Sequence, residues 1–140
     1  MGVCHCGLLK PHNMKHYLLL CLILASAFSI RAQSVYRSIE QIKYAHGMPM
    51  RYISTSRYFL EISFHLRAGF IQFTNKDLHY EDRFINVIPT ETPSSWRAFS
   101  TKTQKAYLIG IKTDNSGKSI TLDDELFVYV IKVNEAVILD

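Results

Sequence analysis

Residues 59–67 read Phe-Leu-Glu-Ile-Ser-Phe-His-Leu-Arg, and from Leu60 onward apolar and polar side chains alternate without interruption. Successive side chains of a β-strand point to opposite faces, so the four apolar residues would share one face and the four polar residues the other. This pattern is typical of a strand with one face on a hydrophobic core and the other in water. The stretch therefore predicts a half-buried β-strand.

The residues that follow continue the same pattern. Arg67-Ala68-Gly69 is suited to a tight turn, and Phe70–Thr74 would return as the hairpin partner before Asn75-Lys76-Asp77 ends the run. Phe84–Ile88 predicts a further short strand that ends at Pro89. The segment from Pro89 to Ser95 contains two prolines, two threonines and two serines and predicts an exposed loop.

The C-terminal third has the strongest β character. Residues 106–111 and 126–133 are apolar at nearly every position, as is typical of central strands that are covered on both faces. Between them, Asp114-Asn115-Ser116-Gly117 predicts a turn, and residues 119–122 a short strand. Residues 136–139 could add an edge strand at the end of the chain.

Only one segment favours a helix. Val35, Ile39 and Ile42 recur at helical spacing, and Ser38 followed by Gln41 resembles a capping box. We therefore expect a short helix over residues 35–45. The whole pattern predicts a mainly β fold: an antiparallel β-sandwich, or a curved sheet or barrel, with one short N-terminal helix. The alternative is an α+β fold in which the helix packs on an antiparallel sheet.

Residues 1–32 have the layout of a secretory leader. A positive flank around Lys15 precedes an apolar run over residues 17–30. The small residue Ala32 follows, and we expect cleavage after it. The run is too short for a bilayer-spanning helix, which needs about 20 residues, so we expect no stable membrane span after cleavage. Because the charged flank should adjoin the apolar run, Met14 is a better initiator than Met1. We expect a mature chain that begins near Gln33, forms one β-rich domain over residues 33–140 and is periplasmic or secreted.

The predicted leader also accounts for the cysteines and the basic charge. All three cysteines, Cys4, Cys6 and Cys21, lie within it, so the mature chain has no disulfide framework. Three of the 16 Lys and Arg residues and none of the 12 acidic residues are in the leader, which leaves 13 basic against 12 acidic. A nearly neutral chain without a basic block argues against nucleic-acid binding.

Two groups of residues are candidates for a site. His79, Glu81 and Asp82, with His65 across a hairpin, contain the ligand types of a metal site or an acid/base pair, although an exposed turn is the commoner role of such residues. Trp96 and Tyr80 lie near turns, where an aromatic side chain can anchor a ligand or partner. For Trp96, a place in the core is the main alternative.

These observations lead to three functional hypotheses. The first is a small exported non-enzymatic module, structural or binding, that contacts a partner through an aromatic surface. The second is a carrier that holds a small apolar ligand in a β cavity, and the third is a hydrolase or metal enzyme that uses His79, Glu81 and Asp82. We expect the chain not to be an enzyme and to need no cofactor. An exposed aromatic patch would favour the first hypothesis, and an enclosed cavity the second. A cluster of the His79, Glu81 and Asp82 side chains would favour the third.

Overall fold

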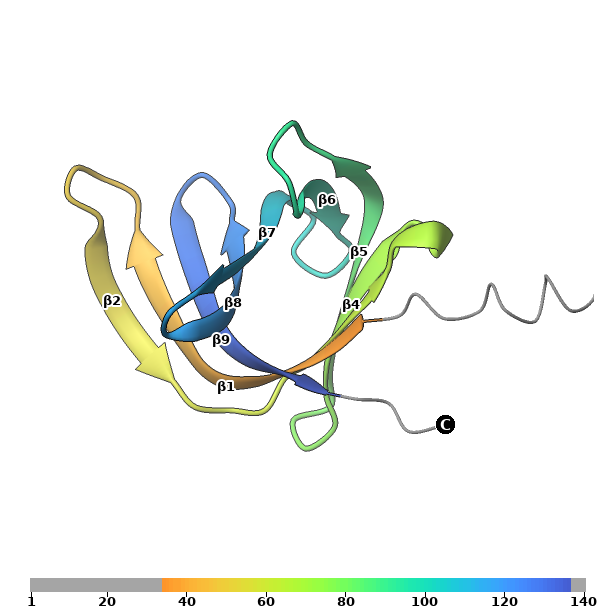
Figure 1. The fold of residues 1–140 in the computed structure, drawn as a ribbon, viewed down its shortest axis with the longest axis horizontal. Helices are drawn as coiled ribbons and strands as arrows, with labels where there is room; N and C mark the ends of the chain where they lie inside the picture. The colour runs from red at the N-terminus through yellow and green to blue at the C-terminus, as the bar shows by residue number, and fades with distance from the viewer. Residues whose placement is uncertain (1–33, 137–140) are drawn as a thin grey trace, which may run out of the picture. The chain divides into compact units, whose positions relative to one another are not determined.

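The computed structural model describes residues 34–136, which form a curved antiparallel sheet of nine strands (Figure 1). The leader predicted for residues 1–32, with its cysteines and the alternative start at Met14, lies outside these residues, as do positions 137–139 of the predicted edge strand. No helix in the described part has the length and apolar character needed to cross a membrane. The strands are β1 (Ser34–Ala45), β2 (Arg51–Ser56), β3 (Glu61–His65), β4 (Phe70–Asn75), β5 (Tyr80–Pro89), β6 (Ser95–Ser100), β7 (Ala106–Asp114), β8 (Gly117–Asp123) and β9 (Phe127–Ala136).

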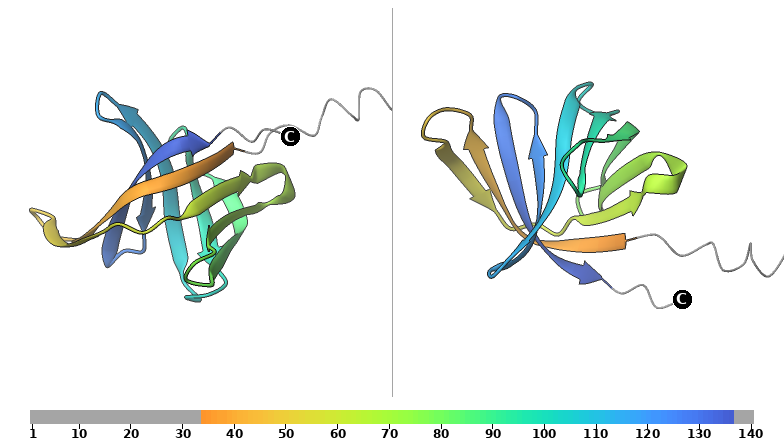
Figure 2. Two further views of the ribbon diagram at one scale, coloured as in Figure 1. Left: turned by 90° about the horizontal axis from the view of Figure 1, so that it is seen from below. Right: turned by 45° about the horizontal axis from the view of Figure 1, so that its top comes forward.

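The last strand closes the sheet on the first. Strands β3 to β9 pair in sequence order, and β9 pairs with residues 35–45 of β1, apart from one bulged residue. The other edge of β1 is shared, because residues 34–37 pair with β3 and residues 41–45 pair with β2. Strands β1 and β3–β9 thus form an eight-stranded antiparallel barrel, and β2 extends beside it (Figures 1 and 2). The prediction of a mainly β antiparallel fold is confirmed, in its curved sheet or barrel form.

The predicted helix over residues 35–45 is wrong, because these residues form β1. The pairing with β9 passes from Ser38 to Glu40 without using Ile39, which is an extra residue in a β-bulge. In a regular strand Val35 and Ile42, seven positions apart, would point to opposite faces, but the extra residue places both on the outer face. The apolar residues Val35, Ile39 and Ile42 therefore have the four- and three-residue spacing that is typical of one face of a helix. The only helical turn among the described residues is a 3₁₀ turn at Leu66–Ala68.

The strands predicted from alternation are confirmed, but the first of them is shorter than predicted. It ends at His65, and Leu66 lies in the 3₁₀ turn, where it is 41% exposed and does not share the buried face. Ile62 and Phe64 of β3 are buried inside the barrel, while Glu61 faces outward. The following turn ends at Gly69, whose φ of 79° lies in the left-handed region that glycine adopts without steric cost. Residues 70–75 return as β4, and β5 covers the predicted strand over residues 84–88.

The prediction that the strands over residues 106–111 and 126–133 are buried on both faces is wrong. In β7, Tyr107 and Ile109 are buried inside the barrel, whereas Leu108 between them is 43% exposed on the outer face. In β9, Ile131 and Val133 are buried. A barrel has one filled interior, and its apolar outer positions are left in contact with solvent.

The interior divides along the barrel axis into two ends. The packed end is filled by side chains that belong to the hydrophobic core: Tyr36, Ile62, Phe64, Ile71, Trp96, Ile109, Ile120 and Val133. Two edge-to-face or tilted ring contacts stabilise it, with Phe64 5.7 Å from Tyr36 and 5.5 Å from Trp96 between ring centroids. At the other end, here called the open end, the inner side chains surround a cavity.

Candidate functional site

The cavity at the open end has a volume of about 270 Å³. Most of its wall comes from inner-face positions of the barrel strands, and the β2–β3 linker, the β4–β5 turn and the β6–β7 loop complete its rim. It is lined by Gln41, Tyr58, Leu60, Phe73, Asn75, Leu78, Tyr80, Asp82, Phe84, Thr103, Tyr107, Leu122, Tyr129 and Ile131. The volume lies near the lower end of the ~300–1,000 Å³ range of small-molecule sites, so a ligand of this cavity would be compact.

Four tyrosines, Tyr58, Tyr80, Tyr107 and Tyr129, give the wall its aromatic character. Burial raises the pKa of Tyr58 and Tyr107 above the usual value of 10.0. Burial, with the nearby charge of Asp82, raises the pKa of Tyr80 to about 12. These three phenols are therefore neutral at physiological pH and keep their O–H groups as hydrogen-bond donors.

Asp82 is the buried acidic group of the cavity wall, with 2% of its surface exposed. The Ser100 hydroxyl donates to its carboxylate, at 2.7 Å from one oxygen and 2.9 Å from the other. The backbone N–H of Lys102 donates to the same carboxylate at 3.3 Å. Ser100 is itself held in place, because its hydroxyl oxygen accepts the backbone N–H of Thr103 at 3.0 Å. The β6–β7 loop is thereby tied to the cavity wall through one carboxylate.

Gln41 adds an unsatisfied donor to the same cavity. Its side chain is 6% exposed, and its Nε2 atom has no hydrogen-bond partner among the described residues. The amide faces the phenol oxygen of Tyr58 and lowers the pKa of that phenol by hydrogen bonding, against the larger opposing effect of burial, but the two groups do not form a well-aligned hydrogen bond. A buried donor without a partner typically costs about 1–3 kcal/mol, so Gln41 is a group that a ligand could satisfy.

Of the two residues predicted to bind, Tyr80 lines the cavity and Trp96 does not. Trp96 is half-buried at the packed end, where it pairs with Ile109 of β7 and contacts Phe64. Its place there agrees with the core alternative stated for it. The sequence reasoning did not select Gln41 or the other three tyrosines of the cavity, since their convergence depends on strand register.

The four weak candidates for metal or acid/base chemistry do not converge. Alternation along β5 places Asp82 inside the barrel and Glu81 outside, where it accepts a hydrogen bond from Gln72 at 2.8 Å. His65 stacks on Phe70 with ring centroids 4.3 Å apart, and His79 is exposed in the β4–β5 turn. Within residues 34–136, no group of three or more His, Cys, Asp or Glu side chains is arranged to hold a metal ion.

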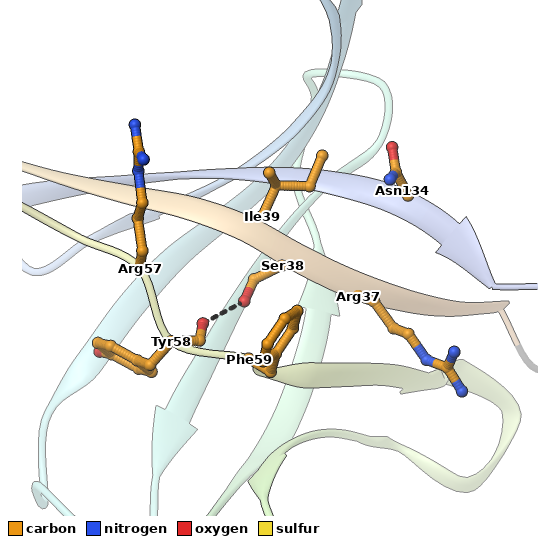
Figure 3. Close-up of a pocket in the computed structure, with 7 residues that line it drawn as sticks. All are labelled: Arg37, Ser38, Ile39, Arg57, Tyr58, Phe59 and Asn134. Atoms are coloured by element: carbon orange, nitrogen blue, oxygen red, sulfur yellow. Dashed lines mark hydrogen bonds between the residues drawn. The ribbon is translucent and has the colours of Figure 1, made fainter.

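A second depression, of about 670 Å³, lies on the outer face over the β1 bulge (Figure 3). Here the Ser38 hydroxyl donates to the Tyr58 carbonyl at 2.8 Å and accepts the Leu60 N–H at 2.7 Å, which holds the β2–β3 linker against β1. Arg37 and Arg57 extend to opposite sides of this depression instead of converging (Figure 3). Its organised polar contacts are therefore structural, and the inner cavity is the better candidate site.

The tyrosines provide a prediction on pH. In the unfolded chain they should ionise near pH 10, whereas in the folded protein burial holds the proton on Tyr58, Tyr80 and Tyr107 to higher pH. Because the folded state binds these protons more tightly, the contribution of these tyrosines to the free energy of unfolding should be constant well below pH 10 and should be lost as the pH rises from about 10 toward 12. Denaturation series at pH 8, 10 and 11 would measure this. Phenol absorbance that rises in a single step near pH 10 in the folded protein would contradict it.

The site thus combines aromatic walls, neutral phenol donors, one buried carboxylate and one unsatisfied amide donor in a compact cavity. Comparisons with protein-family models, curated proteins and solved structures found no match. The functional argument therefore rests on this geometry. Chemically, such a cavity can enclose a small molecule and orient it by a few polar contacts.

Proposed function

We propose that this protein is a non-enzymatic carrier that holds a small ligand in the cavity at the open end of the barrel. The observation that carries the proposal is the cavity lined by aromatic and polar side chains, in which Gln41 Nε2 is a buried donor that forms no well-aligned hydrogen bond with the described residues. Buried donors in folded proteins are almost always paired, and an exception needs an explanation. A ligand with an acceptor atom would provide one.

The rest of the lining supports the same proposal. Phe73, Phe84 and Leu122 offer apolar surface to the body of a ligand, and the neutral phenols offer donors for orientation. With the leader predicted for residues 1–32, the carrier would work in the periplasm or outside the cell.

A protein-contact role is the second candidate, and the β1–β2 hairpin favours it. Met48 is fully exposed, and Met50, Tyr52 and Ile53 are 52%, 58% and 39% exposed. Exposed apolar groups gathered on one projecting hairpin are a common feature of contact surfaces. We rank this role second because these four exposed residues include no buried polar group that lacks a hydrogen-bond partner. The third hypothesis, an enzyme that uses His79, Glu81 and Asp82, receives no support from the placement of these residues.

Filling the cavity tests the carrier proposal. Leu122→Trp would add a large side chain inside the cavity, whereas Leu108→Trp would add the same group on the outer face of the neighbouring strand. We expect tyramine or its neutral counterpart tyrosol to bind the wild type and Leu108→Trp equally. Leu122→Trp should weaken binding at least about tenfold, or about 1.4 kcal/mol. Isothermal titration calorimetry measures this, with circular dichroism to verify folding. Absence of binding to the wild type, or equal binding by Leu122→Trp, would reject the proposal.

A further inference from the structure

We infer that the ligand of the open-end cavity is a small cation: an amine or quaternary ammonium compound with an apolar or aromatic body. This inference rests on the proposed carrier function and specifies its ligand class. It follows from three features of the cavity: a buried carboxylate that has no cationic partner in the described part of the chain, the aromatic rings beside it, and two lysine ammonium groups that already contact such rings.

The carboxylate of Asp82 is the first feature. None of the described Lys, Arg or His residues forms an ion pair with it, although it is 98% buried. Removing a charge from water is costly unless the charge is paired. Its hydrogen bonds from Ser100 and Lys102 leave lone pairs unused, since a carboxylate can accept about four hydrogen bonds. A ligand ammonium would supply the missing positive charge and further donors.

The aromatic rings are the second feature. A ring face is electron-rich and attracts a cation within about 6 Å of its centroid. Tyr58, Tyr80, Tyr107 and Tyr129 line the same cavity as Asp82, so a ligand cation could contact a ring and a carboxylate together. This pairing of aromatic walls with a buried anion is the arrangement that recognises ammonium groups.

The protein's own lysines are the third feature. The Lys102 ammonium lies 3.9 Å from the centroid of the Tyr80 ring, although the backbone of the same residue contacts Asp82. The Lys43 ammonium lies 3.9 Å from the Phe127 centroid and 5.4 Å from that of Tyr129. Two cavity tyrosines thus already attract ammonium groups. Gln41 Nε2, which forms no well-aligned hydrogen bond with the described residues, would bind an acceptor atom elsewhere on the ligand, such as a hydroxyl oxygen.

Anionic and neutral ligands fit these features less well. The buried Asp82 charge would repel an anion in a low-dielectric wall, where charge interactions are strong. A neutral molecule could fill the apolar space but would leave the carboxylate without a partner. Selectivity for positive charge is therefore the property to measure.

Three nearly isosteric probes of different charge test the inference: tyramine (cation), tyrosol (neutral) and 3-(4-hydroxyphenyl)propionate (anion). By calorimetry on the wild type, tyramine should bind at least about tenfold more tightly than tyrosol, and the propionate most weakly. Asp82→Asn should reduce tyramine binding to the level of tyrosol. Glu81→Gln removes the neighbouring charge on the outer face and should leave the binding of all three unchanged. Lys102→Met removes the resident cation from Tyr80 and should strengthen tyramine binding.

The comparison of probes on the wild type is decisive even if Asp82→Asn fails to fold. If tyrosol binds as tightly as tyramine and Leu122→Trp blocks both, the carrier function stands and the cationic ligand class is wrong. If no probe binds, the carrier function and the ligand class fail together. A tyramine preference that survives in folded Asp82→Asn would also overturn the inference.

Discussion

Ile109→Asp should unfold the protein. Ile109 is fully buried in β7, where it pairs with Trp96 on one side and Leu122 on the other. An aspartate there would place an unpaired charge, or a protonated carboxyl without a partner, among apolar side chains. Such a change costs several kcal/mol, which is a large part of the ~5–15 kcal/mol that stabilises a domain.

The neighbouring position gives a matched control. Leu108→Asp makes the same type of substitution one residue away, but this side chain is 43% exposed on the outer face. Its carboxylate would remain in water, so we expect a change within about 1 kcal/mol. Urea denaturation of both variants measures the difference. Equal midpoints for Ile109→Asp and the wild type would contradict the inward orientation of Ile109.

Trp96→Ala should destabilise the fold without affecting ligand binding. The indole contacts Phe64 at the packed end and does not line the cavity. Its loss should cost about 3 kcal/mol, at the lower end of the ~3–5 kcal/mol typical of Trp→Ala in cores, because the side chain is only half-buried. Affinity for a ligand at the open end should remain within about twofold of the wild type if the two ends are independent.

Thermal melts and calorimetry with the same probe would test both parts. A variant of wild-type stability that loses ligand binding would make Trp96 a contact residue and contradict its structural role. Phe59→Ala provides a control, since Phe59 is also aromatic but 76% exposed. That substitution should leave both stability and cavity binding nearly unchanged.

Much of the fold can be predicted from the sequence. One face of most strands lines the barrel interior, and this produces alternating apolar and polar residues. The alternation over residues 59–67 gave β3 its correct face, and Gly69 gave the turn that follows. The failure at β1 has a specific cause. The bulge at Ile39 adds one residue to the outer face, and a period-two pattern with one insertion resembles a helical period over a short window.

The candidate site was less accessible to sequence reasoning. The position of Tyr80 near a turn predicts a binding role, and Tyr80 does line the cavity. The sequence around Asp82 predicts a metal or acid/base role, but the position of its side chain depends on which face of β5 points inward. Gln41 and Tyr129 are far apart in sequence and meet only through the β1–β9 pairing, which no local pattern reveals. Local periodicity identifies strands, whereas a cavity depends on how distant strands are registered.

The pairing of β1 with β9 also determines when the fold can form. The barrel closes only when its first and last strands meet, and contacts between distant segments make folding slow. A ribosome that has released the chain only as far as β8 would hold a sheet whose two edges are still unpaired. Such open edges are prone to pair with other chains, so the nascent protein should depend on a chaperone until β9 emerges. When β9 completes the barrel, it also covers the open sheet edges that could otherwise pair with other chains.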